Sequence, residues 1–152
     1  MQKNSSFTGE YYYSLDNKNR VNIPAKFRRP LGPDSRTFVV TRGFDECLLL
    51  YPSTEWCKVE SQLIKLSSLK GKHRGFIRSI VRHATYLQFD SQGRVNLPDR
   101  LIEYSNINKK ITIIGMINKI ELWDPETLER SDSESIDISD QSFEDLANEI
   151  DF

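Results

Sequence analysis

DNKNRVNIP, residues 16–24, and DSQGRVNLP, residues 90–98, are two copies of one nine-residue motif that lie 74 residues apart. Five of the nine positions are identical, and Ile23 and Leu97 differ only conservatively. A match of this length indicates an internal duplication, and internal similarity takes precedence over length in deciding architecture. The 152-residue chain, which by length alone would be one domain, is therefore predicted to fold as two pseudo-symmetric halves.

Each half is predicted to contain two short strands joined by a polar turn, a helical turn after a proline, and then a hairpin. The expected strands cover residues 7–14, 20–22, 38–41, 48–51, 111–114 and 120–123. Runs of β-branched and aromatic residues bounded by turn formers are typical of such strands. The predicted fold class is therefore mainly β with added helices (α+β).

Helices are expected after each proline of the motif and after each hairpin. Asp124 before Pro125 is a helix N-cap pattern, and Ser53 is expected to cap a helix in the same way in the first half. Apolar residues at helical spacing then predict a helical hairpin between the halves. The predicted divisions are a first module over 7–54, a helical connection over 55–82, a second module over 83–126 and an acidic, disordered tail over 131–152.

Each copy of the motif is predicted to form a tight turn of defined shape. Asp16 and Asp90 stand at its start, where a carboxylate accepts hydrogen bonds from backbone N–H groups two residues further on. Asn19 and Gly93 stand near its end, where a residue must tolerate positive φ. We therefore expect these four residues to shape the two loops.

Charge is unevenly distributed along the chain. The sequence has 21 basic and 22 acidic residues, but eight of the acidic residues follow Ser131, where there is no Lys or Arg. The remainder, with 21 basic and 14 acidic residues, carries a charge of +7. A basic body indicates an anionic partner, and an acidic, serine-rich end is typical of disordered or regulatory segments. Phe143, Leu146, Ala147 and Ile150 recur at helical spacing, so a short amphipathic helix is the alternative to disorder.

The motif and its surroundings resemble the bacterial MraZ family. Asp-x-x-x-Arg followed by Val-Asn-Ile-Pro or Val-Asn-Leu-Pro occurs twice. The other stretches that carry the resemblance are Gly9-Glu10-Tyr11, Pro24-Ala25-Lys26-Phe27-Arg28, Val40 to Asp45, and Leu50-Tyr51-Pro52 with Trp56. The resemblance extends from about Phe7 to Arg130.

The resemblance implies two SpoVT/AbrB-like swapped-hairpin β-barrel modules per chain and a ring-forming homo-oligomer. It further implies a sequence-specific transcriptional regulator that binds direct repeats in double-stranded promoter DNA. The promoter would be that of its own division and cell-wall operon, which the protein would repress. No cofactor is expected.

The loop residues suit DNA recognition. Arg pairs bidentately with O6 and N7 of guanine, Lys reaches guanine or a phosphate, and Gln suits adenine. Arg28, one turn beyond the first loop, can reach a phosphate and so fix the register of the protein on the DNA. The predicted DNA-binding residues are Lys18, Arg20, Arg28, Gln92 and Arg94.

Two of these features also have plainer interpretations. Arg20 or Arg94 could be a structural arginine paired with its own aspartate, a surface contact of small energetic consequence. The duplication of the whole motif favours recognition. Three other arginines, Arg74, Arg78 and Arg82, recur every four residues, as is typical of a solvated helix face, with a phosphate contact as the alternative.

Other protein classes fit the sequence less well. It has no nucleophile elbow and no phosphate-binding glycine loop, so no catalytic residues are expected. No metal is expected, because Cys47 and Cys57 lack the spacing of metal ligands and only His73 and His83 could join them.

The sequence has no signal peptide and no apolar run of membrane length, so the expected location is cytoplasmic, at the nucleoid, away from the membrane. The non-enzymatic alternative is an antitoxin-type scaffold whose acidic tail binds a partner protein.

Overall fold

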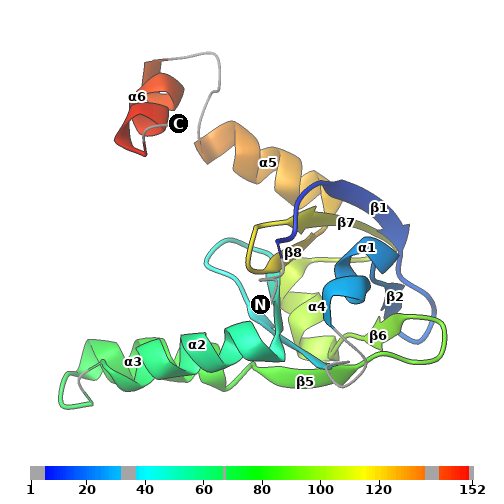
Figure 1. Ribbon diagram of the computed structural model, residues 1–152, viewed down its shortest axis with the longest axis horizontal. Coiled ribbons are helices and arrows are strands. Elements are labelled where there is room, and N and C mark those ends of the chain that lie inside the picture. Colours follow the sequence, from blue (N-terminus) through cyan, green and yellow to red (C-terminus); the bar gives the residue numbers. More distant parts are fainter. Residues whose placement is uncertain (1–5, 32–36, 67, 136–140, 151–152) are drawn as a thin grey trace.

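The computed structural model describes residues 6–31, 37–66, 68–135 and 141–150. Within them, a six-stranded sheet with the order β1-β7-β8-β4-β3-β5 lies beside a two-stranded sheet of β2 and β6 (Figure 1). The strands are β1 Glu10–Ser14, β2 Arg20–Asn22, β3 Thr37–Arg42, β4 Leu48–Pro52, β5 Thr85–Gln88, β6 Arg94–Asn96, β7 Lys110–Gly115 and β8 Ile120–Trp123. The predicted mainly β fold is confirmed, although β1 begins three residues later than expected, after Gly9 with its φ of 97°.

Helices connect and cover these strands. They are α1 Ala25–Arg28, α2 Ser53–Ile64, α3 Gly71–Val81, α4 Asp99–Ser105, α5 Pro125–Ser135 and α6 Gln141–Glu149, with a 3₁₀ turn η1 over Arg29–Leu31. Helices α2 and α3 form the helical hairpin expected between the two halves (Figure 1). A helical turn follows each motif proline, as the sequence predicts.

Each half gives its first strand to the hairpin of the other half. β1 pairs antiparallel with β7, with Tyr12 opposite Thr112, and β5 pairs antiparallel with β3, with Tyr86 opposite Val39. The two hairpins, β3–β4 and β7–β8, then meet through the pairing of β4 with β8. The two halves therefore cannot separate without breaking several strand ladders.

The two copies of the motif also pair with each other directly, through β2 and β6. The register joins Arg20 with Asn96, Val21 with Val95, and Asn22 with Arg94. Arg20 and Arg94 are equivalent positions in the duplication, so this antiparallel register is symmetric. It places a pseudo-twofold axis between the two valines.

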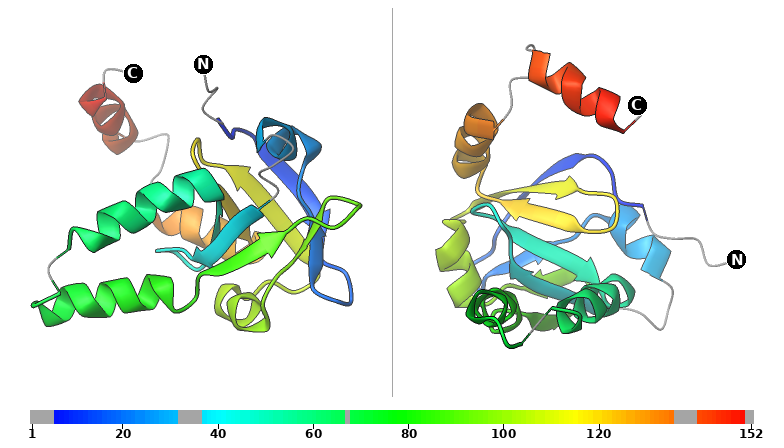
Figure 2. Two further views of the ribbon diagram at one scale, coloured as in Figure 1. Left: turned by 60° about the horizontal axis from the view of Figure 1, so that its bottom comes forward. Right: turned by 90° about the vertical axis from the view of Figure 1, so that its left-hand side faces the viewer.

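Two apolar clusters lie on opposite faces of the large sheet. In β4, Leu48 and Leu50 belong to the cluster that contains the motif valines, while Leu49 belongs to the other. This alternation is expected, because successive side chains of a strand point to opposite faces. The second cluster is covered by α2, α3 and α5, through residues such as Trp56 and Leu128 (Figure 2). Because β4 is buried on both faces, the sheet is the centre of the molecule.

The barrel closure expected from the resemblance is not found. In the described residues, β1 and β5 are the edges of the six-stranded sheet, and each pairs on one side only. The physical reason is the length and pairing of β2 and β6. These strands have three residues each and pair with each other, so no ladder joins one edge of the large sheet to the other.

One further expectation about helices is corrected, and one segment expected to be disordered is described in part. Ser53 is the first residue of α2, and its side chain does not cap the helix, whereas Asp124 does cap α5 by accepting a hydrogen bond from the Thr127 N–H at 3.1 Å. The acidic segment, expected to be disordered over 131–152, is helical over 131–135 and 141–149. No Gly or Pro interrupts the helix between Leu128 and Ser135. The other tail residues, apart from Ile150, lie outside the described ranges.

None of the helices in the described ranges is long and apolar enough to cross a bilayer.

We predict that Gly115→Ala destabilises the protein by about 1–3 kcal/mol, because overpacking a tight site forces the backbone to move. A Cβ at position 115 would collide with backbone atoms of Phe7 and Thr8, which cannot rotate away as a side chain can. Urea unfolding followed by circular dichroism measures the effect.

The matched control is Gly75→Ala in α3, where nothing lies within 4 Å of the added Cβ. It should stabilise the protein by about 0.5–1 kcal/mol, since alanine loses less backbone entropy in a helix. Equal effects of the two substitutions would contradict the close approach at Gly115.

Candidate functional site

A carboxylate holds the backbone of each motif loop in the same way. Asp16 Oδ1 accepts hydrogen bonds from the N–H groups of Lys18 and Arg20, both at 2.9 Å. Asp90 Oδ1 accepts the equivalent bonds from Gln92 at 2.9 Å and Arg94 at 3.0 Å. Each loop is thus a turn closed from the inside by its own first residue.

The second carboxylate oxygen holds the motif arginine. Arg20 Nε donates to Asp16 Oδ2 at 2.7 Å, and Arg94 Nε donates to Asp90 Oδ2 at 2.8 Å. The Nη1 atom of Arg94 also lies 3.8 Å from Asp16 Oδ2, so the arginine of the second loop reaches the aspartate of the first. The two arginine side chains, 30% and 23% exposed, are therefore held in defined positions at the surface.

These contacts stabilise the ionised form of both carboxylates. The hydrogen bond from the Arg94 backbone N–H is the largest cause that lowers the pKa of Asp90, to about 2, and its guanidinium adds to the effect. The pKa of Asp16 is lowered in the same way, first by the Arg20 backbone N–H. Both loops are consequently in their bonded form at neutral pH.

The positive φ near the end of each loop is accommodated differently in the two copies. Asn19 has φ 61° and its Nδ2 donates to Asp99 Oδ1 at 2.7 Å. Gly93 has φ 76°, and a Cβ there would lie 2.5 Å from Arg28 Cζ. The first loop therefore has space for a side chain, while in the second loop Arg28 occupies that space.

Arg28 is consequently placed against the neighbouring loop. Its Nε donates to the carbonyl of Ile23 at 2.9 Å, and its guanidinium covers Gly93. This partly buried side chain supports the packing of the two loops. Its expected contact with a DNA phosphate stays a prediction.

The two loops lie side by side at one end of the molecule, on the right of Figure 1. The pairing of β2 with β6 is continued by backbone hydrogen bonds from Ile23 N–H to the Gly93 carbonyl at 3.1 Å and from Leu97 N–H to the Asn19 carbonyl at 2.9 Å. The structure thus brings Lys18, Arg20, Gln92 and Arg94 together in the two loops, with Lys18 and Gln92 exposed, and places the fifth predicted DNA-binding residue, Arg28, beside the second loop. We call these two loops, residues 16–20 and 90–94, the loop pair.

The arginine stripe of α3 is not part of this surface. Arg74, Arg78 and Arg82 are exposed on the helical hairpin, which extends to the opposite side of the molecule from the loop pair (Figure 1). Arg74 Nη1 also donates to the carbonyl of Ser68 at 2.8 Å and so closes the hairpin turn. Within one chain, the stripe and the loop pair cannot contact the same short stretch of a ligand.

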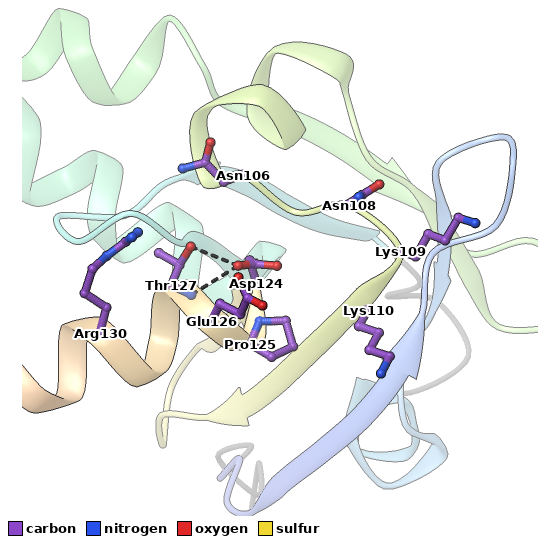
Figure 3. A pocket seen from close by; sticks show the side chains of 9 residues that line it. All are labelled: Asn106, Asn108, Lys109, Lys110, Asp124, Pro125, Glu126, Thr127 and Arg130. Atoms are coloured by element: carbon purple, nitrogen blue, oxygen red, sulfur yellow. Dashed lines mark hydrogen bonds between the residues drawn. The ribbon is translucent and has the colours of Figure 1, made fainter.

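A surface depression of about 780 Å³ lies between the end of α4, the start of β7 and the start of α5 (Figure 3). Its lining combines the cations Lys109, Lys110 and Arg130 with the carboxylates of Asp124 and Glu126. Asp124 is already bonded to Thr127 as a helix cap, as Figure 3 shows. One of the two carboxylates of the depression therefore has a structural role at the start of α5.

The cysteines are placed apart from any ligand cluster. Cys47 is buried, and burial raises the pKa of its thiol, whereas Cys57 is exposed on α2. Across the described ranges, no group of three or more His, Cys, Asp or Glu side chains is arranged to hold a metal ion.

Three contacts of the loop pair could not be found from the sequence. They are the approach of Arg94 to Asp16, the hydrogen bond from Asn19 to Asp99, and the packing of Arg28 on Gly93. The only signal was the difference between Asn19 and Gly93 at equivalent positions. That difference shows that the two loops have different neighbours without showing what they are.

We predict that acid weakens the fold through the loop carboxylates. A carboxylate whose pKa is lower in the folded state than in the unfolded chain stabilises the fold above the unfolded value, and this stabilisation is lost as pH falls through the folded value. The free energy of unfolding should therefore decrease between about pH 4, the ordinary range of an aspartate, and pH 2, the region of the Asp90 pKa.

Asp90→Asn tests this assignment in urea unfolding at a series of pH values. The variant should be less stable than the parent at pH 6, and its stability should fall less steeply between about pH 4 and pH 2. Parallel curves for parent and variant would show that Asp90 does not carry the acid sensitivity.

Comparison with known proteins agrees with the duplication. The family model described as "MraZ protein, putative antitoxin-like" matches the chain twice, over residues 6–79 and 80–151. A relative from Halothermothrix orenii, called transcriptional regulator MraZ, is 41% identical over 141 residues, which cover 93% of this chain and 94% of the relative. With both halves matched and nearly the whole length aligned, the chain belongs to the MraZ family.

Proposed function

We propose that this protein is a transcriptional regulator that binds specific DNA sequences through the loop pair. The observation that carries the proposal is the geometry of the two copies of the motif. Two arginines from equivalent positions are held side by side, each through its Nε, by carboxylates that also close the loops. The relative's name, transcriptional regulator MraZ, supports the same class of function.

Each loop residue has a role that its chemistry allows. A guanidinium has five N–H donors, so an arginine that uses Nε within its loop can still offer its Nη groups to O6 and N7 of guanine, the bidentate contact that reads this base. Exposed Lys18 can reach a guanine or a phosphate, and exposed Gln92 suits adenine. Arg28 would act at a phosphate from its position beside the second loop.

One loop pair offers few contacts, so we infer that binding depends on several copies. A homo-oligomeric ring would present the loop pair repeatedly, and linked weak sites raise the overall affinity through effective concentration. Such a ring fits direct repeats in promoter DNA. The protein would act in the cytoplasm at the nucleoid. There it would repress its own division and cell-wall operon, as the family resemblance implies.

We predict that the double variant Arg20→Lys/Arg94→Lys loses preference for promoter DNA but keeps nonspecific binding. Lysine retains the charge and loses the planar, bidentate donor group of arginine. Each bidentate contact between an arginine and a guanine is worth about 1–3 kcal/mol of discrimination against the wrong base. Affinity for the operon's promoter repeats should fall by at least about tenfold. Fluorescence anisotropy with promoter and scrambled duplexes at physiological salt measures both affinities.

The matched control is Arg100→Lys/Arg130→Lys, which makes the same change at two exposed arginines of α4 and α5, outside the loop pair. It should leave the preference for promoter DNA unchanged. Equal, weak binding of the parent to both duplexes would contradict sequence-specific recognition. It would favour the protein-interaction scaffold instead.

Lys18→Ala should weaken binding to promoter and scrambled DNA alike if Lys18 contacts a phosphate. The slope of log K against log salt concentration should become less steep by about one for each loop engaged. Anisotropy titrations at several salt concentrations give the slope. An unchanged slope with a changed base preference would assign Lys18 to a base.

A further inference from the structure

An apolar groove runs along the helical hairpin of α2 and α3. One part of it has a volume of about 360 Å³ and includes Ile64, Ile77 and Val81 in its lining. A second part, of about 460 Å³, continues from it and shares Ile77 and Val81. Ile64 is 82% exposed and Val81 is 49% exposed. The groove therefore presents large apolar side chains that its own chain does not cover.

One margin of this groove is basic. Arg74, Arg78 and Arg82 line its second part. Helix α3 has the sequence GKHRGFIRSIV and contains no acidic residue. The first part includes Glu60 and no basic residue, so the arginines favour negative charge at the second part. A ligand that fits the groove should therefore combine an apolar face with negative charge near the arginines.

Helix α6 has this combination. Phe143 and Leu146 of α6 and Ile150, the residue directly after it, recur at positions i, i+3 and i+7, and they are 46%, 52% and 71% exposed. Helix α6 also carries Glu144, Asp145 and Glu149 and has no Lys or Arg. A nine-residue helix is too short to be stable by itself, so a surface that covers its apolar face would stabilise it.

We propose that α6 of one copy docks into the α2–α3 groove of a second copy of this chain. The apolar residues of α6 would lie along Ile64, Ile77 and Val81, and its carboxylates would face the arginine margin. Anchors at i, i+3 and i+7 in an apolar groove are the usual way in which an amphipathic helix is recognised. The opposite charges of the two surfaces favour this pairing over contact of either surface with itself.

The second copy is preferred as the source of the helix, because within one chain both surfaces remain exposed. Figures 1 and 2 place α6 beyond the end of α5, away from the hairpin. A contact between two different surfaces is heterologous, so it leaves a free groove and a free helix for further copies. Repetition of the contact closes a ring if the rotation between copies allows it.

This inference rests on the self-association proposed above and names the contact that would produce it. It does not depend on DNA recognition. The loop pair lies at the opposite side of the molecule from the groove (Figure 1), so the two surfaces can be changed separately.

The experiment uses two double variants of the full chain, analysed by size-exclusion chromatography with light scattering. The helix variant is Phe143→Ser/Leu146→Ser, and the groove variant is Ile64→Ser/Val81→Ser. The control is Met116→Ser/Ile117→Ser, which alters two exposed apolar residues of the β7–β8 turn. Each test variant should weaken self-association at least about tenfold, since two apolar anchors are lost, and the control should assemble like the parent.

An equimolar mixture of the two variants decides where the helix docks. The helix variant keeps an intact groove and the groove variant keeps an intact α6, so the mixture should form a species of two chains that neither variant forms alone. Two smaller species that stay separate would overturn the proposal.

Two other results would also overturn the proposal, with different consequences for the function. An oligomeric parent whose variants assemble normally would mean that another surface carries the assembly, and the proposed ring would stand. A monomeric parent would remove both the contact and the ring, while DNA binding by the loop pair would still be decided by anisotropy.

Discussion

The antiparallel pairing of β2 with β6 is the contact on which the arrangement of the two motif loops depends. It joins the two copies of the motif through Val21 and Val95, and both valines are buried in the main apolar cluster. A three-residue strand has too few hydrogen bonds to be stable alone. Its persistence therefore requires the large sheet, which is itself assembled by giving β1 and β5 to the opposite hairpins. Symmetric pairing of the two motifs necessarily places their loops side by side.

Within that arrangement, the structural and the recognition roles of the motif arginines are compatible. The bond from Arg20 to Asp16 is a surface ion pair, which by itself contributes little to stability. Its larger effect is on order, because it restricts a long side chain that would otherwise lose rotamer entropy when it binds a ligand. A contact that is only structural in the free protein would thus prepare the side chain for the proposed contact with a DNA base.

The distribution of charge separates two surfaces with different partners. The loop pair presents cations at one end of the molecule, where the proposed ligand is DNA (Figure 1). The helical hairpin presents an apolar groove with arginines on its margin, and α6 presents apolar and acidic side chains together. The acidic residues near the C-terminus would then serve assembly, and repeated loop pairs would gain affinity from it. The nearly balanced net charge of −1 conceals this separation.

The sequence by itself determined the duplication, the strands and helical turns of each half, and the shape of the loops. These features depend on residue type at short range: an aspartate accepts N–H groups two and four residues further on, and Asn19 or Gly93 accepts a positive φ. Only the tertiary structure decided that β1 joins β7, that the sheet stays open, that Arg28 covers Gly93 and that Asn19 bonds to Asp99, 80 residues away. Such pairings depend on how two halves with similar patterns pack together. Because both halves have the same pattern, the pattern does not specify which half supplies the partner of a given strand or side chain.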